Sequence, residues 1–211
     1  MKKAATAIAL WALTAFGTAM AADGTPLMKG GDPDAGKALS QTCAGCHGAQ
    51  GNSAAAQFPN IAAQHAGYIF KQLKNFKAGD KRNNAQMSGM VANLSQDDMR
   101  NLAAYFNQQP KKVMGASDKD LVERGQEIYL GGVKPDGVPA CAACHGPRGK
   151  GNPAANYPAV GGQWAQYLQT QLKNFRAGER ANDPNAMMRN VAEQLSDDEI
   201  RAVAEYMAGL N

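Results

Sequence analysis

Two matching pentapeptides hold all four cysteines of the chain and two of its three histidines. The first is CAGCH at 43–47, and the second is CAACH at 141–145. On a helix, the cysteines of each motif stand three positions apart and the histidine follows four positions after the first cysteine, so the three side chains face one way. Two thiols at this spacing reach the two vinyl groups along one edge of a porphyrin, with the imidazole beneath the metal.

The spacing C-x-x-C-H is typical of the attachment of c-type heme, so the sequence predicts two covalently bound heme c groups. The thioether bonds are expected at Cys43, Cys46, Cys141 and Cys144, and iron ligation is expected at His47 and His145. A disulfide or a thioredoxin-type dithiol is an alternative for a cysteine pair, but no strand–helix–strand pattern surrounds either motif. A four-thiolate zinc site needs pairs about 15–20 residues apart, whereas most of a domain separates these.

The sequence around the two motifs is duplicated. Two pairs of segments match: 51–81 with 151–180, and 91–106 with 191–207. A repeat of this length indicates two copies of a domain and not a solenoid. We expect the domains at 22–109 and 119–211, joined by an exposed linker at 110–118.

Each copy is predicted to form three to four helices with long loops. A first helix is predicted from Asp32 or Asp34 to its end at Gly48, and the apolar positions before Gly79 recur at helical spacing. An N-cap signature occurs at Ser95 with Asp98, and the second copy repeats it. Close crossing of the first and last helices is suggested by Gly36, Gly125, Tyr105 and Tyr206. The fold class is therefore all-α, with no stretch long enough to predict a strand.

The second axial ligand decides whether a heme transfers electrons or also binds small molecules. Met87 and Met188 each stand seven residues before a Leu-Ser helix start, and we expect these two methionines to bind iron. Met87, forty residues beyond His47, is expected in a loop. Met90 is the alternative in the first copy. Met187 is the alternative in the second, because aligning the two Val-Ala pairs favours it.

The remaining histidine, His65, has Trp164 as its counterpart, so we expect it at the surface or at the domain interface and not on iron. The pairs Phe58-Pro59 and Tyr157-Pro158 follow the two motif histidines closely. A backbone carbonyl there could accept the Nδ1–H of the histidine and fix its tautomer. A turn proline without this role is the other interpretation.

The first 21 residues are typical of a cleaved signal peptide: two lysines, an uncharged stretch and a closing Ala-Met-Ala. Export predicts the periplasm of a Gram-negative bacterium as the location. The formal charge of +4 is too small for a nucleic-acid binder, and no long basic run occurs. A group of basic residues near the first heme could guide partners or simply face solvent: Lys71, Lys74, Lys77, Lys81 and Arg82.

The chain resembles the diheme cytochrome c4 family. The likeness covers the paired motifs, the QLKNF helices, MSGMVANLS, MMRNVAEQLS and the ending EYMAGL. It implies two tandem cytochrome c domains related by pseudo-twofold symmetry, with iron ligation by His47/Met87 and His145/Met188. It also implies a respiratory electron carrier between a quinol-oxidising complex (quinol-cytochrome c reductase) and a terminal oxidase, in loose association with the membrane surface.

Electron transfer without catalysis is the leading functional hypothesis. A diheme peroxidase would need an open iron site with distal acid and base groups, and the scarcity of histidine argues against it. A heme subunit of a larger dehydrogenase is a further alternative, and it would require a partner chain because no flavin motif is present.

Overall fold

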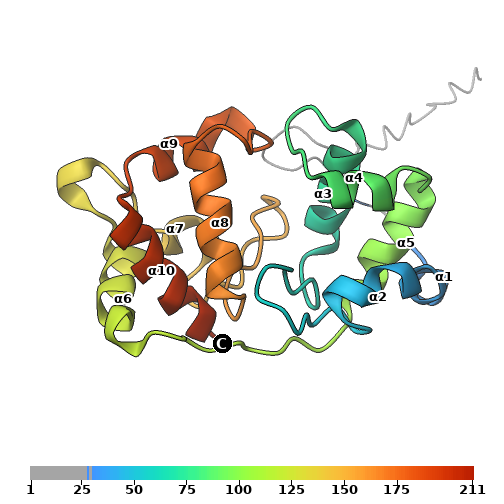
Figure 1. Cartoon of the computed structure of the whole chain (residues 1–211), viewed down its shortest axis with the longest axis horizontal. Coiled ribbons are helices and arrows are strands. Elements are labelled where there is room, and N and C mark those ends of the chain that lie inside the picture. Colours follow the sequence, from blue (N-terminus) through green and yellow to red (C-terminus); the bar gives the residue numbers. More distant parts are fainter. Residues whose placement is uncertain (1–27, 29) are drawn as a thin grey trace, which may run out of the picture.

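The computed structural model describes residue 28 and residues 30–211, so the predicted signal peptide at 1–21 lies outside the described residues. The described part is helical, with isolated β-bridges and no named strand. Figure 1 shows two helical halves side by side. The segment that joins them, residues 108–118, runs along one edge of the molecule and is called the strap below. Among the described residues, no helix is long and apolar enough to span a membrane.

The two halves contain corresponding helices in the same order. The N-terminal half contains α1 (Pro33–Leu39), α2 (Gln41–His47), α3 (Ala66–Ala78), α4 (Ala85–Val91) and α5 (Gln96–Asn107). The C-terminal half contains α6 (Val122–Gly131), α7 (Ala142–His145), α8 (Ala165–Arg176), α9 (Met187–Glu193) and α10 (Asp197–Gly209). Three short 3₁₀ turns accompany the second set: η1 (Lys119–Leu121), η2 (Lys134–Asp136) and η3 (Pro184–Ala186). The all-α prediction is confirmed, although each half has more short helices than expected.

The helix ends follow local side-chain chemistry. The Asp32 side chain accepts from the backbone N–H of Asp34 and caps α1, and Gly79 ends α3 in the left-handed conformation. Ser95 forms a complete capping box with Asp98 at the start of α5, and the second half repeats it at α10. The predicted single helix before Gly48 is instead broken at Ser40 into α1 and α2.

The first and last helices of each half cross in close contact, as the glycine pattern predicted. A Cβ at Gly36 would lie 2.0 Å from the carbonyl oxygen of Asn101, and one at Gly125 would lie 2.1 Å from that of Ala202. No side chain fits at either position, so glycine sets the packing distance between α1 and α5 and between α6 and α10. The motif helix α2 follows α1 directly in the chain, whereas α7 follows α6 after the short turn η2.

The segment between the halves is hydrogen-bonded along its length. Asn52 bonds both the carbonyl of Pro110 (2.8 Å) and the backbone N–H of Lys112 (2.8 Å). The Lys111 ammonium donates to the carbonyl of Gly161 at 2.7 Å, and the Gly115 N–H donates to the carbonyl of Ala208 at 3.0 Å. The strap is therefore fixed to both halves.

Candidate heme-binding sites

The two motif histidines occupy the same environment in each half. His47 ends α2 and His145 ends α7, and both rings are buried. The Nδ1 atom of His47 lies 2.9 Å from the carbonyl oxygen of Pro59, and that of His145 lies 2.9 Å from that of Pro158. Because a carbonyl only accepts, Nδ1 carries the proton and Nε2 keeps its lone pair for a metal. Burial lowers the pKa of both imidazoles and favours this neutral form.

The four cysteines, all within the described residues, form no disulfide. Cys43 and Cys141 are half-buried, whereas Cys46 and Cys144 are exposed. Burial raises the pKa of the Cys43 thiol and raises that of Cys141 to about 11. Each motif therefore has one sulfur against the core and one at the surface, as a flat group with one exposed edge requires.

Met87 lies in α4 and not in the loop that the sequence predicted. The side chain of Asn84 caps this helix and accepts from the backbone N–H of Met87 at 2.9 Å. Met87 is half-buried and packs against an apolar cluster that contains Phe76, Val91 and Met99. The alternative, Met90, lies on the same helix with 49% of its surface exposed. Of the two, Met87 points to the apolar interior.

In the second half, Met188 packs against the apolar core that also contacts Cys141. The neighbouring Met187 has its sulfur 3.9 Å from the hydroxyl of Tyr157. The two candidates thus have different surroundings, one apolar and one with a polar neighbour. This contrast favours Met188 as the counterpart of Met87.

The residues of each half fit a covalently bound heme. Two thiols, one unprotonated imidazole nitrogen and one thioether belong to each set, and all four donors are of kinds that heme c uses. In the N-terminal half, the clusters that contact Cys43 and Met87 share three partly buried side chains: Phe70, Leu73 and Leu94. In the described part of the chain, no group of three or more His, Cys, Asp or Glu side chains could hold a metal ion.

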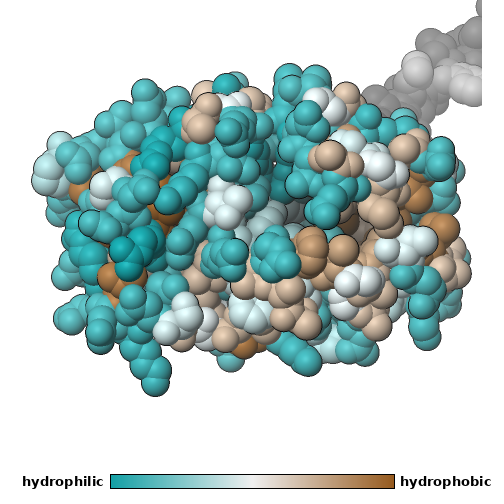
Figure 2. All heavy atoms as spheres, viewed as in Figure 1, coloured by the Kyte–Doolittle hydropathy of each residue, from teal (hydrophilic) through white to brown (hydrophobic). Residues whose placement is uncertain are grey.

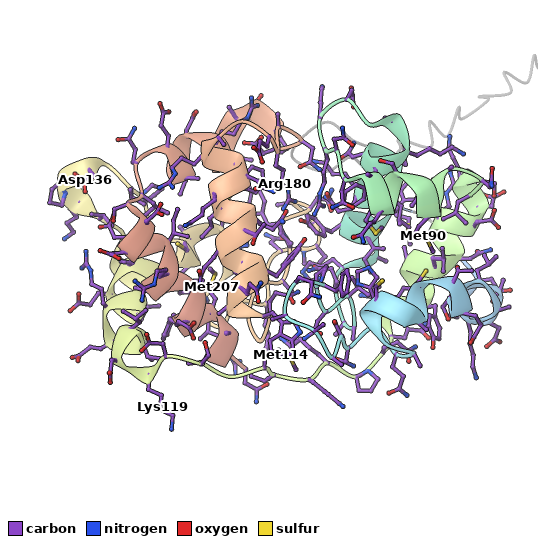
Figure 3. All side chains as sticks on the ribbon, viewed as in Figure 1. Met90, Met114, Lys119, Asp136, Arg180 and Met207 are labelled. Atoms are coloured by element: carbon purple, nitrogen blue, oxygen red, sulfur yellow. The ribbon has the colours of Figure 1, made fainter. Side chains whose placement is uncertain are left out.

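The halves meet through a reciprocal pair of arginines, Arg82 and Arg180. Figure 3 labels one of them, Arg180, between the two halves. Arg82 and Arg180 form an antiparallel backbone bridge. Arg82 Nη2 donates to the hydroxyl of Tyr167 at 3.0 Å, and Arg180 Nη2 donates to that of Tyr68 at 2.7 Å. Each arginine thus bonds a tyrosine of the opposite half, an arrangement with approximate twofold symmetry.

Arg82 is buried, so its grouping with solvent-facing lysines was wrong. Burial and the neighbouring Arg180 lower the pKa of its guanidinium. Burial alone would raise the pKa of the Tyr68 phenol, but the two guanidinium groups hold it below its ordinary value. This cluster of two arginines and two tyrosines was not predicted from the sequence, although both arginines follow the matching helix sequences QLKNFKAG and QLKNFRAG.

His65 also lies at the interface, as predicted. Its Nε2 atom is 2.8 Å from the carbonyl oxygen of Lys150 in the other half. Two glutamines at matching positions, Gln64 and Gln163, cross the interface as well. The available sequence signal was that glutamine occupies this position in both copies. A shared residue type does not by itself indicate a contact between the halves.

Fold and sites together define a c-type cytochrome with two tandem heme domains. The cytochrome c family model matches residues 33–110 and 122–211. A cytochrome c4 from Azotobacter vinelandii is 45% identical over 190 residues, which cover 86% of this chain and 90% of the relative. The chain therefore belongs to the cytochrome c family and, within it, to the diheme cytochrome c4 proteins.

Two further relatives extend the comparison. The crystal structure of reduced recombinant cytochrome c4 from Pseudomonas stutzeri superposes with a TM-score of 0.84 at 41% identity, covering 86% of this chain and all of that one. A thiosulfate dehydrogenase electron acceptor from Stutzerimonas stutzeri strain A1501 is 41% identical, covering 91% of this chain and 88% of the relative. The chain is thus a diheme electron-transfer protein and not an enzyme, with two covalent heme c groups at its cysteine motifs.

Proposed function

We propose that this cytochrome carries electrons in the periplasm from a quinol-oxidising complex to a terminal oxidase. We further propose that His47 with Met87, and His145 with Met188, are the axial ligands of the two irons. Each heme supplies a one-electron Fe(III)/Fe(II) couple, whose potential is raised by methionine relative to a second histidine. A raised potential suits a carrier near the oxidase end of a respiratory chain.

The observation that carries the proposal is the paired donor set of each half. An imidazole with Nδ1 bonded to a carbonyl leaves Nε2 for iron, and a methionine in apolar surroundings is available to close the opposite position. Iron held by two side chains exchanges electrons without admitting a substrate. A carrier role follows from this closure.

The surface supports docking of partners at the N-terminal half. Figure 2 shows hydrophobic side chains gathered over this half, while the C-terminal half is mostly hydrophilic on the same face. The exposed Met90 and the exposed Cys46 belong to the N-terminal half. Lys74 and Lys77 of α3 are exposed beside Lys71, in a position to steer an acidic partner. A small apolar contact with basic surroundings suits a transient redox complex, loosely held at the membrane surface.

A second candidate function comes from the relative named as a thiosulfate dehydrogenase electron acceptor. On this alternative the chain accepts electrons from a dehydrogenase subunit instead of a quinol-oxidising complex. The same fold and the same two hemes serve either donor. Purified donor enzymes distinguish the two: rapid reduction by the quinol-oxidising complex supports the first, and reduction by thiosulfate dehydrogenase alone supports the second.

The ligands are tested by replacing each methionine with alanine in the intact diheme protein. Met87→Ala and Met188→Ala should each remove half of the methionine-to-iron absorption of the oxidised protein and leave one high-spin heme. Met90→Ala and Met187→Ala are the matched controls and should keep the wild-type spectrum. Loss of the band in Met187→Ala, with Met188→Ala unchanged, would transfer the ligand assignment to Met187.

A further inference from the structure

The peptide group that accepts the Nδ1–H of each heme histidine forms hydrogen bonds through both its carbonyl and its N–H. The carbonyl of Pro59 accepts from His47, while the N–H of the same peptide group, that of Asn60, donates to Gln163 Oε1 at 2.8 Å. Gln163 belongs to the opposite half, 103 residues further along the chain. One peptide therefore joins the histidine of one half to an amide of the other.

The second half repeats the arrangement in the reverse direction. The carbonyl of Pro158 accepts from His145, and the N–H of the same peptide group, that of Ala159, donates to Gln64 Oε1 at 2.9 Å. Gln64 lies in the N-terminal half. Each series of hydrogen bonds, from histidine through the peptide group to glutamine, is called a relay below. Each relay starts at a histidine of one half and ends at a glutamine of the other half.

Both glutamines are held in one orientation. Gln163 Nε2 donates back to the carbonyl of Asn60 at 2.8 Å, and Gln64 Nε2 donates to that of Ala159 at 2.8 Å. Each Oε1 also accepts the backbone N–H of the next residue, Trp164 at 3.1 Å and His65 at 3.0 Å. Because these N–H groups can only donate, the oxygen of each amide must face them.

The site is buried, so water does not replace these bonds readily. Gln163 is 8% exposed and Asn60 is 5% exposed. Hydrogen bonds in series polarise one another, with each bond strengthening the next by about 10–30%. An acceptor on the N–H therefore makes the carbonyl of the same peptide a stronger acceptor for the histidine proton. A stronger bond at Nδ1 makes the imidazole a more basic ligand at Nε2.

We propose that Gln163 tunes the redox potential of the N-terminal heme and that Gln64 tunes that of the C-terminal heme, each across the domain interface. The proposal rests on the ligation by His47 and His145 stated above. Both glutamines are positioning residues, since neither reaches iron. A more basic imidazole stabilises Fe(III), so each glutamine lowers the potential of the heme in the opposite half.

The test replaces each glutamine with leucine in the intact diheme protein and follows both hemes during stepwise reduction. Hyperfine-shifted proton resonances report the two hemes separately, and through-space contacts to protons of its own half assign each one. Gln163→Leu should raise the reduced-to-oxidised ratio of the N-terminal heme about two- to fivefold at a fixed potential, with the C-terminal heme nearly unchanged. A tenfold change would correspond to 59 mV for a one-electron couple. Gln64→Leu should give the reverse pattern.

The matched control is Tyr167→Phe. It removes one hydrogen bond between the halves, from Arg82, without touching either proline peptide. It should weaken the interface without a crossed redox response. A second measurement is the Nδ1–H resonance of each histidine in the reduced protein, which should move for His47 in Gln163→Leu and for His145 in Gln64→Leu.

The possible results distinguish an effect through the relay from a general loss of stability and from an error in the ligand assignment. Equal shifts of both hemes, a shift of the heme in the mutated half, or the same response to Tyr167→Phe would each overturn the relay. If Gln163→Leu fails to mature, the less buried Gln64 is tested alone, and its effect must again fall on the opposite heme. A wild-type spectrum without two methionine-ligated hemes would instead overturn the proposed function.

Discussion

Replacement of Gly125 by alanine should destabilise the C-terminal half strongly, since this glycine sets the distance between α6 and α10. The added Cβ would lie 2.1 Å from the carbonyl oxygen of Ala202 and 2.8 Å from the Cβ of Tyr206. The backbones must separate by about 1 Å to reach ordinary contact, and a gap of that size forfeits about a quarter to a half of each dispersion contact.

The two helices that would separate, α6 and α10, contribute much of the apolar core of the C-terminal half. Ile128, Tyr129, Ile200 and Val203 are at most 1% exposed. Overpacking of a buried site costs about 1–3 kcal/mol, and here the obstruction is backbone, which cannot rotate away. We therefore expect Gly125→Ala to lose about 3 kcal/mol of unfolding free energy, measured by urea denaturation of the diheme protein with far-UV circular dichroism.

The same helix provides the control. Gly131 is the last residue of α6, and a Cβ there meets nothing within 4 Å. Gly131→Ala should be neutral or stabilise by up to about 1 kcal/mol, because alanine has the higher helix propensity. Unfolding of Gly125→Ala at the same urea concentration as Gly131→Ala would show that Gly125 does not set the distance between the two helices.

Two further predictions concern α10. Ser196→Ala should cost about 1 kcal/mol in urea denaturation, because it removes half of the capping box with Glu199, and an unchanged midpoint would refute that role. Hydrogen bonds from Lys173 and Arg176 lower the pKa of Asp197 to about 2 from 3.8, so its charged form stabilises the fold above pH 4 and this contribution disappears as the pH falls to 2. The stability difference between wild type and Asp197→Asn should shrink over that range, and a difference that stays constant would contradict the assignment.

Helix ends, the close helix contact at Gly36 and the heme-attachment motifs could be predicted from the sequence. The capping residues Ser95 and Ser196, the stop at Gly79 and the close contact at Gly36 depend on neighbours within one helix or on the absence of a side chain. The cysteine motifs likewise depend on spacing within a single turn of helix. Duplication of these signals in register gave the two-domain, all-α prediction.

Contacts between the halves were not readable in this way. The bonds of Gln64, Gln163 and Arg82 join residues 85 to 103 positions apart, and they depend on how two finished surfaces meet. Arg82 was therefore placed with the surface lysines, although it is buried. Met87 was expected in a loop because α4 is only seven residues long and lacks an extended apolar pattern.

The strap between the halves has a consequence for the rate of internal electron exchange. Since Lys111 and Gly115 bond the C-terminal half while Pro110 and Lys112 bond Asn52, a hinge motion would break several of these bonds at once. We expect an electron that passes between the two heme sites to do so at one fixed separation, without a search through domain orientations. The exchange is governed by driving force and reorganisation energy, and it should be insensitive to solvent viscosity.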